Sequence, residues 1–246
     1  MKTRLLLPFL FVLAAFVASG NAQEDAFAKG NQEYAAGRFR EAIELYENAV
    51  GGGATNAAVF YNLGNAYYRA GDLGRAILNY ERALALESHY PEAEANLRLV
   101  RDKARALELK RSALDRIVLQ TSATTYSVIA AIAFWIAAFC LATMFFSGRP
   151  SPLRATMLVT SVLVCAAGVA GVYLSETGSA GRALAIVTAA GTEARVATAD
   201  SASTVLALPP GSQVKVLSRR GDWLYATLPN DLRGWIPAQN AERVRL

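Results

Sequence analysis

The sequence predicts a multi-domain membrane protein that combines an all-α solenoid, two transmembrane helices and a small all-β domain. Three observations support this fold class. Near the N-terminus, a pattern of glycines, alanines and aromatic residues recurs with a period of 34 residues. Two uncharged apolar runs of about 20 residues follow it. After residue 174 the apolar residues occur in short runs separated by turn-forming residues, which is typical of β-strands.

Residues 1–22 have the composition of a secretory signal peptide. Lys2 and Arg4 precede the apolar run LLLPFLFVLAAFVA, and the small residues Gly20 and Ala22 lie at its end. A basic start, an apolar middle and a small-residue cleavage site characterise such leaders. We therefore expect cleavage after Ala22 and export of the mature chain from Gln23 onward. An uncleaved N-terminal anchor is the alternative.

Residues 23–56 and 57–90 are predicted to form two units of a helical repeat. Within each unit the apolar residues recur three and four positions apart, as expected of helices that bury one face. Gly71 is suited to end the first helix of the second unit, and Asp72 is suited to cap the next helix. A shift of 34 residues superimposes several pairs: Gly30 on Gly64, Asn31 on Asn65, Tyr34 on Tyr68 and Tyr46 on Tyr80.

These units resemble the tetratricopeptide (TPR) repeat, in which two antiparallel helices form one step of a solenoid. A further helix is predicted from Pro91, because proline suits the first turn of a helix. Residues 23–108 are therefore expected to comprise two repeats and a capping helix that covers the open edge of the solenoid. Residues 109–125 are expected to continue as a charged helical stalk.

The resemblance implies a protein-binding groove along the first helix of each repeat. Asparagine side chains there can donate and accept hydrogen bonds, and tyrosines combine apolar area with a polar tip. Packing between helices is the alternative interpretation of the tyrosines. The candidate groove residues are Phe27, Asn31, Tyr34, Tyr61, Asn65, Tyr68 and Arg69.

Residues 126–146 and 155–174 are predicted to be transmembrane helices, since each run is uncharged and long enough to cross about 30 Å of hydrocarbon. The connecting loop, residues 147–154, carries Arg149 and Arg154 and no acidic residue. Positively charged loops stay in the cytoplasm, so both flanking domains are expected to face the periplasm of a bacterial inner membrane. Three basic residues before the first span oppose this orientation but lie at least ten residues from it: Lys110, Arg111 and Arg116.

The predicted spans contain small residues and no ionisable ones. Gly168 and Gly171 favour close packing of the two helices, and the absence of ionisable residues argues against ion transport. Cys140 and Cys165 both lie in the spans, where buried free thiols are the simplest interpretation. A redox-active pair is a weaker alternative, because antiparallel helices would place the two thiols at different depths.

Residues 175–246 are predicted to form a small all-β domain. Val214 and Val216 show the alternation of a half-buried strand. The motifs Gly221-Asp222-Trp223 and Gly234-Trp235-Ile236, together with Gly211, resemble the bacterial SH3-like (SH3b) domain. The resemblance implies a small barrel, and some members of this family bind cell-wall peptide. The candidate ligand surface comprises Trp223, Tyr225 and Trp235, for which packing in the core or at the barrel edge is the alternative.

Composition and motifs argue against several function classes. The formal net charge of +5 is scattered, and no basic stripe with interleaved aromatic residues predicts nucleic-acid binding. The single histidine, His89, falls in a predicted turn, and no catalytic, phosphate-binding or metal-ligand motif accompanies it. We therefore expect a protein that is not an enzyme and that uses no metal or cofactor.

The order of segments resembles the BatE-type proteins encoded in bacterial aerotolerance (Bat) operons. The most similar stretches are Gly30-Asn31, Tyr61-Asn62-Leu63-Gly64-Asn65-Ala66-Tyr67-Tyr68, Tyr80-Glu81-Arg82-Ala83-Leu84 and Asn96-Leu97. The resemblance implies a non-catalytic inner-membrane scaffold in a stress-tolerance complex. Its periplasmic TPR module would bind membrane-anchored von Willebrand A-domain proteins. A peptidoglycan-binding anchor that acts through the SH3b domain is the alternative function.

Overall fold

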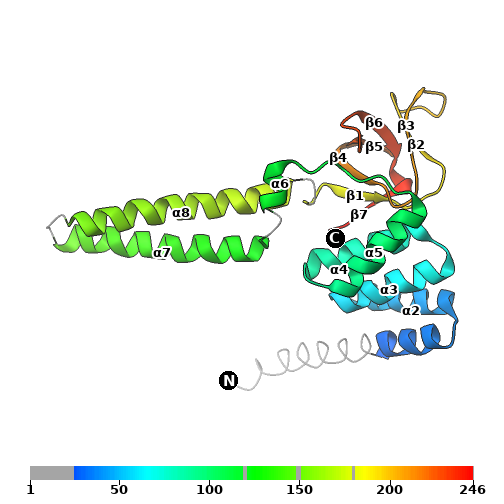
Figure 1. Ribbon diagram of the computed structural model, residues 1–246, viewed down its shortest axis with the longest axis horizontal. Helices are drawn as coiled ribbons and strands as arrows, with labels where there is room; N and C mark the ends of the chain where they lie inside the picture. Colours follow the sequence, from blue (N-terminus) through cyan, green and yellow to red (C-terminus); the bar gives the residue numbers. More distant parts are fainter. Residues whose placement is uncertain (1–24, 119–120, 148–150, 179–180, 246) are drawn as a thin grey trace, which may run out of the picture. The chain divides into compact units, whose positions relative to one another are not determined.

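A computed structural model describes residues 25–118, 121–147, 151–178 and 181–245 (Figure 1). They divide into two compact units. One unit contains the described residues as far as Glu108 together with those from Ala185 onward, and the other contains the described residues of Leu109–Leu184. The predicted signal peptide and Arg149 of the predicted loop lie outside the described residues.

The repeat region is a stack of antiparallel helices (Figure 1). It consists of helical residues 25–35, α2 (Phe39–Gly51), α3 (Ala57–Ala70), α4 (Leu73–Leu86) and α5 (Pro91–Ala104). Gly71 adopts a left-handed φ of 89° and ends α3. The Asp72 carboxylate then caps α4 by accepting a hydrogen bond of 3.0 Å from the Arg75 backbone N–H. The predicted helix boundary at Gly71 and Asp72 is confirmed.

Two glycines set how closely the helices of each repeat approach. A Cβ atom on Gly64 of α3 would come within 2.8 Å of the Tyr80 ring of α4. A Cβ atom on Gly30 would come within 2.6 Å of the Tyr46 ring of α2. Both rings are almost fully buried and cannot easily move aside. The 34-residue period thus corresponds to two equivalent pairs of a glycine and a large ring.

The helix after the second repeat is shorter than the sequence predicts. It ends at Ala104, and Arg105 adopts a positive φ of 53°. The chain then pairs with the C-terminal sheet: the Leu107 N–H donates to Ser212 Oγ (3.1 Å), and the Leu107 carbonyl accepts from the Gln213 N–H (2.8 Å). These bonds satisfy backbone groups that a longer helix would have paired internally. A six-residue helix, α6 (Ala113–Val118), replaces the predicted continuous stalk.

The described C-terminal residues form one antiparallel sheet with strand order β3-β2-β6-β5-β4-β1-β7. Its strands are β1 (Leu184–Val187), β2 (Thr192–Arg195), β3 (Thr204–Leu208), β4 (Gln213–Arg220), β5 (Trp223–Thr227), β6 (Arg233–Pro237) and β7 (Ala241–Arg243). The strands β3 and β7 are the two edges of this sheet, so the predicted barrel is not closed. At the β7 edge, Arg82 of α4 donates to the Arg243 carbonyl (3.1 Å), which gives this edge group a hydrogen-bond partner.

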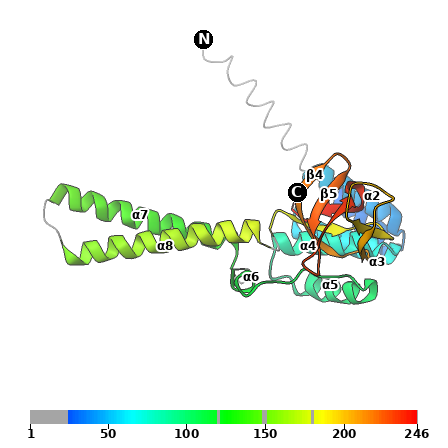
Figure 2. The same ribbon diagram turned by 90° about the horizontal axis from the view of Figure 1, so that it is seen from above.

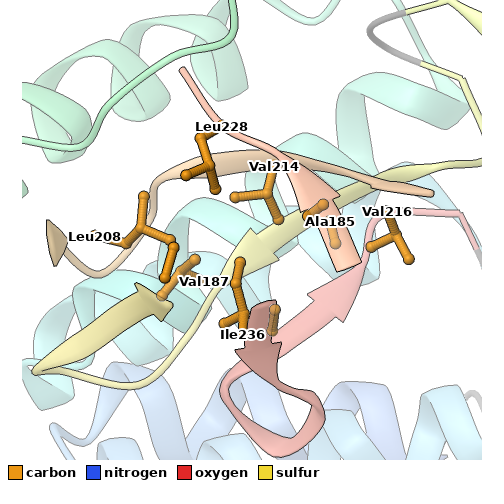
Figure 3. Close-up of a cluster of buried hydrophobic side chains, with 10 residues drawn as sticks. Ala185, Val187, Leu208, Val214, Val216, Leu228 and Ile236 are labelled. Atoms are coloured by element: carbon orange, nitrogen blue, oxygen red, sulfur yellow. The ribbon is translucent and has the colours of Figure 1, made fainter. Parts of the chain in front are cut away.

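One face of the sheet carries the core of the C-terminal domain (Figure 3). Val214 and Val216 of β4 both point into this core, as their alternation predicts, and Ile236 of β6 is fully buried beside them. Because successive side chains of a strand point to opposite faces, Trp235, next to Ile236, lies on the other face. The core residues are Ala185, Val187, Ala194, Leu208, Val214, Val216, Ala226, Leu228, Ile236 and Ala241.

The sheet also packs against the second helix of the second repeat. A Cβ atom on Gly74 of α4 would lie 2.5 Å from the Thr188 carbonyl oxygen, so the backbones are in close contact. The Gln213 amide donates to Glu81 of α4 (2.7 Å), and Glu81 also pairs with Arg101 of α5. The segments before and after the apolar helices therefore fold into a single unit.

The second unit contains two long apolar helices, α7 (Ala123–Ser147) and α8 (Pro152–Thr177), which run antiparallel side by side (Figures 1 and 2). Both are long and apolar enough to cross a membrane. Close packing at small residues is confirmed: a Cβ atom on Gly168 would lie 2.9 Å from the Ala130 Cβ atom. Arg154, expected in the connecting loop, lies in the first turn of α8. Cys140 is buried, Cys165 is half-buried, and both are free thiols.

Candidate functional site

The predicted groove residue Asn65 is held from two directions. Its carbonyl oxygen accepts a hydrogen bond of 2.7 Å from the Tyr80 hydroxyl, which belongs to the second helix of the same repeat. It also accepts one of 3.0 Å from the Asn96 amide on α5, the next helix of the stack. The Asn96 amide reaches the Tyr61 hydroxyl as well, at 3.3 Å. Asn65 thus links α3, α4 and α5.

Asn31 has the same arrangement one repeat earlier. Its carbonyl oxygen accepts from the Tyr46 hydroxyl at 2.8 Å and from the Asn62 amide on α3 at 3.0 Å. Among the described residues, no hydrogen bond uses the side-chain NH₂ group of Asn31 or of Asn65. Each asparagine therefore has its oxygen occupied inside the solenoid and keeps two N–H donors.

The tyrosine hydroxyls are the donors in these hydrogen bonds, because an amide carbonyl oxygen can only accept. Desolvation raises the pKa of Tyr46 to about 12, and burial also raises the pKa of Tyr80 above its ordinary value. Both hydroxyls thus keep their protons, and these hydrogen bonds, to a higher pH than an exposed tyrosine would. This arrangement preorganises the asparagine amides with their N–H groups available.

The three predicted groove tyrosines are half-buried rather than fully packed away. Tyr61 lies against the rings of Tyr80 and Tyr90, with centroid distances of 6.0 and 5.0 Å. Tyr34 meets Phe39 edge to face at 5.4 Å. Interhelical packing therefore accounts for part of each of these two rings, and part remains at the surface.

Two cations, at positions 34 residues apart, lie over aromatic rings of the repeat region. Arg69 is exposed, and its guanidinium lies over the Phe39 ring at 4.5 Å from the centroid. The Lys103 ammonium lies over the Tyr68 ring at 4.8 Å. Lys103 is also exposed, so both positive charges remain in contact with solvent.

Sequence reasoning did not place Asn62, Asn96 or Lys103 in the groove. The signal that identifies them is the 34-residue period continued into α5, since Asn62 shifts onto Asn96 and Arg69 shifts onto Lys103. Taking the helix from Pro91 only as a cap hid this third set of groove positions. The structure places Asn96 and Lys103 next to residues that were predicted.

The aromatic residues of the C-terminal sheet form a second candidate surface. Tyr225 and Trp235 are cross-strand neighbours with ring centroids 4.9 Å apart, on the face opposite the buried core. Trp223 is half-buried on the same face and borders a hollow of about 500 Å³. The hollow is lined by Asp200, Arg219, Asp222, Trp223, Pro237, Ala238 and Gln239.

The remaining candidates for chemistry lie apart from these surfaces. His89 is exposed in the turn before α5 and forms a hydrogen bond with Ser88. Within the described ranges, no three His, Cys, Asp or Glu side chains are grouped in a way that would hold a metal ion.

Comparison with known proteins identifies the repeat region. Residues 27–91 and 61–115 each match the family model described as the tetratricopeptide repeat. No curated protein matches the chain. The overlapping matches include every residue of the groove described above, from Asn31 to Lys103. The N-terminal part of the chain is therefore a TPR region, a structure that generally mediates interactions between proteins.

Proposed function

We propose that this protein is a non-catalytic membrane scaffold whose TPR groove binds a partner protein. The observation that carries the proposal is the repeated asparagine arrangement. Asn31 and Asn65 have their oxygens occupied by internal donors and keep N–H groups for an external acceptor. Half-buried tyrosines beside them offer apolar contact area to the same partner.

The groove favours a partner segment rich in hydrogen-bond acceptors. The amides of Asn31 and Asn65 can donate to backbone carbonyls or carboxylates. Arg69 and Lys103 add two positive charges at equivalent positions of α3 and α5. An extended segment with acidic side chains would satisfy both features.

The apolar helices α7 and α8 are proposed to anchor the scaffold in a bacterial inner membrane. An antiparallel pair of spans returns the chain to the side from which it entered. The TPR region and the sheet need this arrangement, because the contact between Glu81 and Gln213 joins segments from before and after the spans. The leader-like residues 1–22 and the basic loop support a periplasmic location.

The partners are proposed to be membrane-anchored von Willebrand A-domain proteins of a Bat-type stress-tolerance complex. This step rests on the resemblance of the segment order and of the repeat motifs to BatE-type proteins. The SH3b assignment of the sheet rests on its glycine and tryptophan motifs in the same way.

Charge reversal in the groove tests the proposal. The double substitution Arg69→Glu and Lys103→Glu should reduce co-purification of a von Willebrand A-domain partner from native membranes at least tenfold, by roughly 1.4 kcal/mol or more. Arg98→Glu is a matched control, because Arg98 is exposed on α5 without lining the groove. Far-UV circular dichroism should show equal helix content in all variants. Equal co-purification by the groove variant and by the control would contradict the proposal.

A second candidate function is attachment to peptidoglycan through the C-terminal sheet. The position of Trp223, Tyr225 and Trp235 on the face opposite the core favours it, because half-buried aromatic rings beside a hollow with polar and apolar lining suit ligand binding. The full chain in detergent should then sediment with purified peptidoglycan, and Trp223→Ala should weaken sedimentation whereas Leu232→Ala should not. Failure of the wild-type chain to sediment would remove this function.

A further inference from the structure

The short helix α6 leaves two large apolar side chains uncovered. Leu114 and Ile117, one turn apart, are 65% and 62% exposed. Val118 at the end of the same helix is buried, and its carbonyl oxygen accepts a hydrogen bond of 3.3 Å from the Tyr126 hydroxyl of α7. The helix is therefore attached to the hairpin on one side and apolar on another.

The position of α6 is fixed at one end of the hairpin. Tyr126 belongs to the first turns of α7, and Gly178, directly after α8, would bring a Cβ atom within 2.9 Å of Asp115 Oδ1. Ser112 and Asp115 also cap α6 reciprocally: the Asp115 N–H donates to Ser112 Oγ (3.0 Å), and the Ser112 N–H donates to Asp115 Oδ2 (3.3 Å). Contacts from both long helices thus hold α6 where α7 begins and α8 ends.

This end of the hairpin corresponds to a lipid headgroup region. The helices α7 and α8 contain 25 and 26 residues. At ~1.5 Å per residue they exceed the ~30 Å thickness of the hydrocarbon core by several ångströms. Their ends, and α6 with them, therefore reach the interface rather than the middle of the bilayer. Tyr173, 65% exposed near the end of α8, is a residue type that favours the same level.

Basic residues accompany the uncovered apolar side chains. Arg111 and Arg116 are both exposed, and Lys110 precedes them. Apolar side chains next to exposed cations are typical of helices that lie in a membrane surface, because the apolar groups enter the acyl boundary while the cations meet anionic headgroups.

We propose that α6 and its flanking cations bind the surface of an anionic bilayer. Leu114 and Ile117 insert at the boundary between headgroups and acyl chains, and Arg111 and Arg116 contact lipid phosphates. The proposal rests on the proposed membrane hairpin. It also gives a role to Lys110, Arg111 and Arg116, the basic residues that oppose the predicted membrane orientation. Contact with lipid would hold them at the surface of the bilayer.

Depth measurement in lipid nanodiscs tests the proposal on the full chain. Cys140→Ala and Cys165→Ala provide a cysteine-free background, into which Ile117→Cys, Phe139→Cys or Leu232→Cys is introduced and labelled with a fluorophore. Phe139 lies well inside α7, eight residues before its end, and is 70% exposed, and Leu232, between β5 and β6, is 50% exposed. Quenchers placed near the headgroup, deep in the acyl chain or in water then report the depth of each site.

The label at position 117 should be quenched best by the headgroup-proximal quencher, the label at 139 by the deep quencher and the label at 232 by the aqueous one. Aqueous quenching at 117 with lipid quenching at 139 would overturn the lipid contact of α6 but leave the hairpin intact. Aqueous quenching at 139 would instead overturn the membrane hairpin itself. Protection of 117 from every quencher would indicate a protein cover and would also overturn the proposal. Leu114→Cys repeats the measurement if the change at 117 perturbs α6.

Lipid charge provides the second arm of the test. Raising the fraction of anionic lipid should increase lipid quenching at 117, with each cation strengthening attachment roughly fivefold. Arg111→Gln with Arg116→Gln should abolish most of this dependence, whereas Arg98→Gln in α5 should preserve it. Equal dependence in the two variants would overturn the role of the cations.

Discussion

At the scale of single residues, the groove asparagines combine a structural and a binding role. Asn31 and Asn65 each join three helices through one carbonyl oxygen, so their replacement would disturb the solenoid as well as the groove. This is why Arg69 and Lys103, whose charged ends are exposed, are the better positions for testing partner binding.

The buried Tyr46 predicts a loss of stability at alkaline pH. Its pKa is raised from 10.0 to about 12 in the folded chain, so the unfolded chain loses this proton first as the pH rises above 10. Stability from this group is complete below pH 10 and is lost as the pH rises toward 12. Between pH 9 and pH 11.5, the free energy of unfolding should therefore decrease by about 2 kcal/mol more in wild type than in the Tyr46→Phe variant.

Urea denaturation followed by far-UV circular dichroism at the two pH values measures this difference. At pH 9 the variant should be about 1 kcal/mol less stable than wild type, because it lacks the hydrogen bond to Asn31. Parallel pH dependence in the two proteins would show that Tyr46 does not titrate as its burial requires.

The sequence predicted the groove residue types but could not predict how they are bonded. The 34-residue period identifies Asn31 and Asn65 as equivalent, and the structure bonds them equivalently. The partner of Asn65, Tyr80, lies 15 positions away on another helix, so the pairing depends on how the two helices cross. Local propensity and spacing contain no information about that crossing.

At the scale of elements, the period of the repeat was more predictable than the ends of the helices. Gly71 and Asp72 mark their boundary because their side-chain and backbone chemistry acts locally. The end of α5 at Ala104 depends instead on distant residues, since Leu107 pairs with residues more than a hundred positions later in the chain. The β7 edge also has a distant partner, since Arg82 of α4 donates to the Arg243 carbonyl.

Gly64→Ala tests the close approach of α3 and α4. Alanine has a higher helix propensity than glycine by about 1 kcal/mol, but the new Cβ atom would lie 2.8 Å from the buried Tyr80 ring. We expect a net destabilisation of about 1–3 kcal/mol, as for other overpacked cores. Gly51→Ala in α2 is the matched control, since a Cβ atom there meets nothing within 4 Å.

Urea denaturation of both variants measures the effect. Gly51→Ala should be neutral or slightly stabilising, because only the propensity changes. A stabilised Gly64→Ala variant would show that Tyr80 moves freely and that the glycine is not required by packing.

At the scale of the whole molecule, the TPR region and the sheet are joined by buried polar contacts. The side chains of Glu81 and Arg101 are 12% and 11% exposed, and they form an ion pair that also receives the Gln213 amide. Burial of Arg82 lowers its pKa, and its partner Glu242 comes from the last strand. Contacts of this kind are specific, because each buried charge needs its own partner.

This junction predicts that the TPR region and the sheet unfold together, and that Arg101→Leu weakens both. Removing the arginine leaves the Glu81 carboxylate buried without its cation, which typically costs about 3–5 kcal/mol.

In a Trp135→Phe background the remaining tryptophans, Trp223 and Trp235, report only on the sheet, while far-UV circular dichroism is dominated by the helices. Wild-type transitions in urea should coincide by the two probes. In Arg101→Leu both should move to lower urea concentration, whereas Arg98→Leu should leave them unchanged. Separate transitions in the wild-type chain, or a shift of only the circular dichroism signal in the variant, would show that the two parts fold independently.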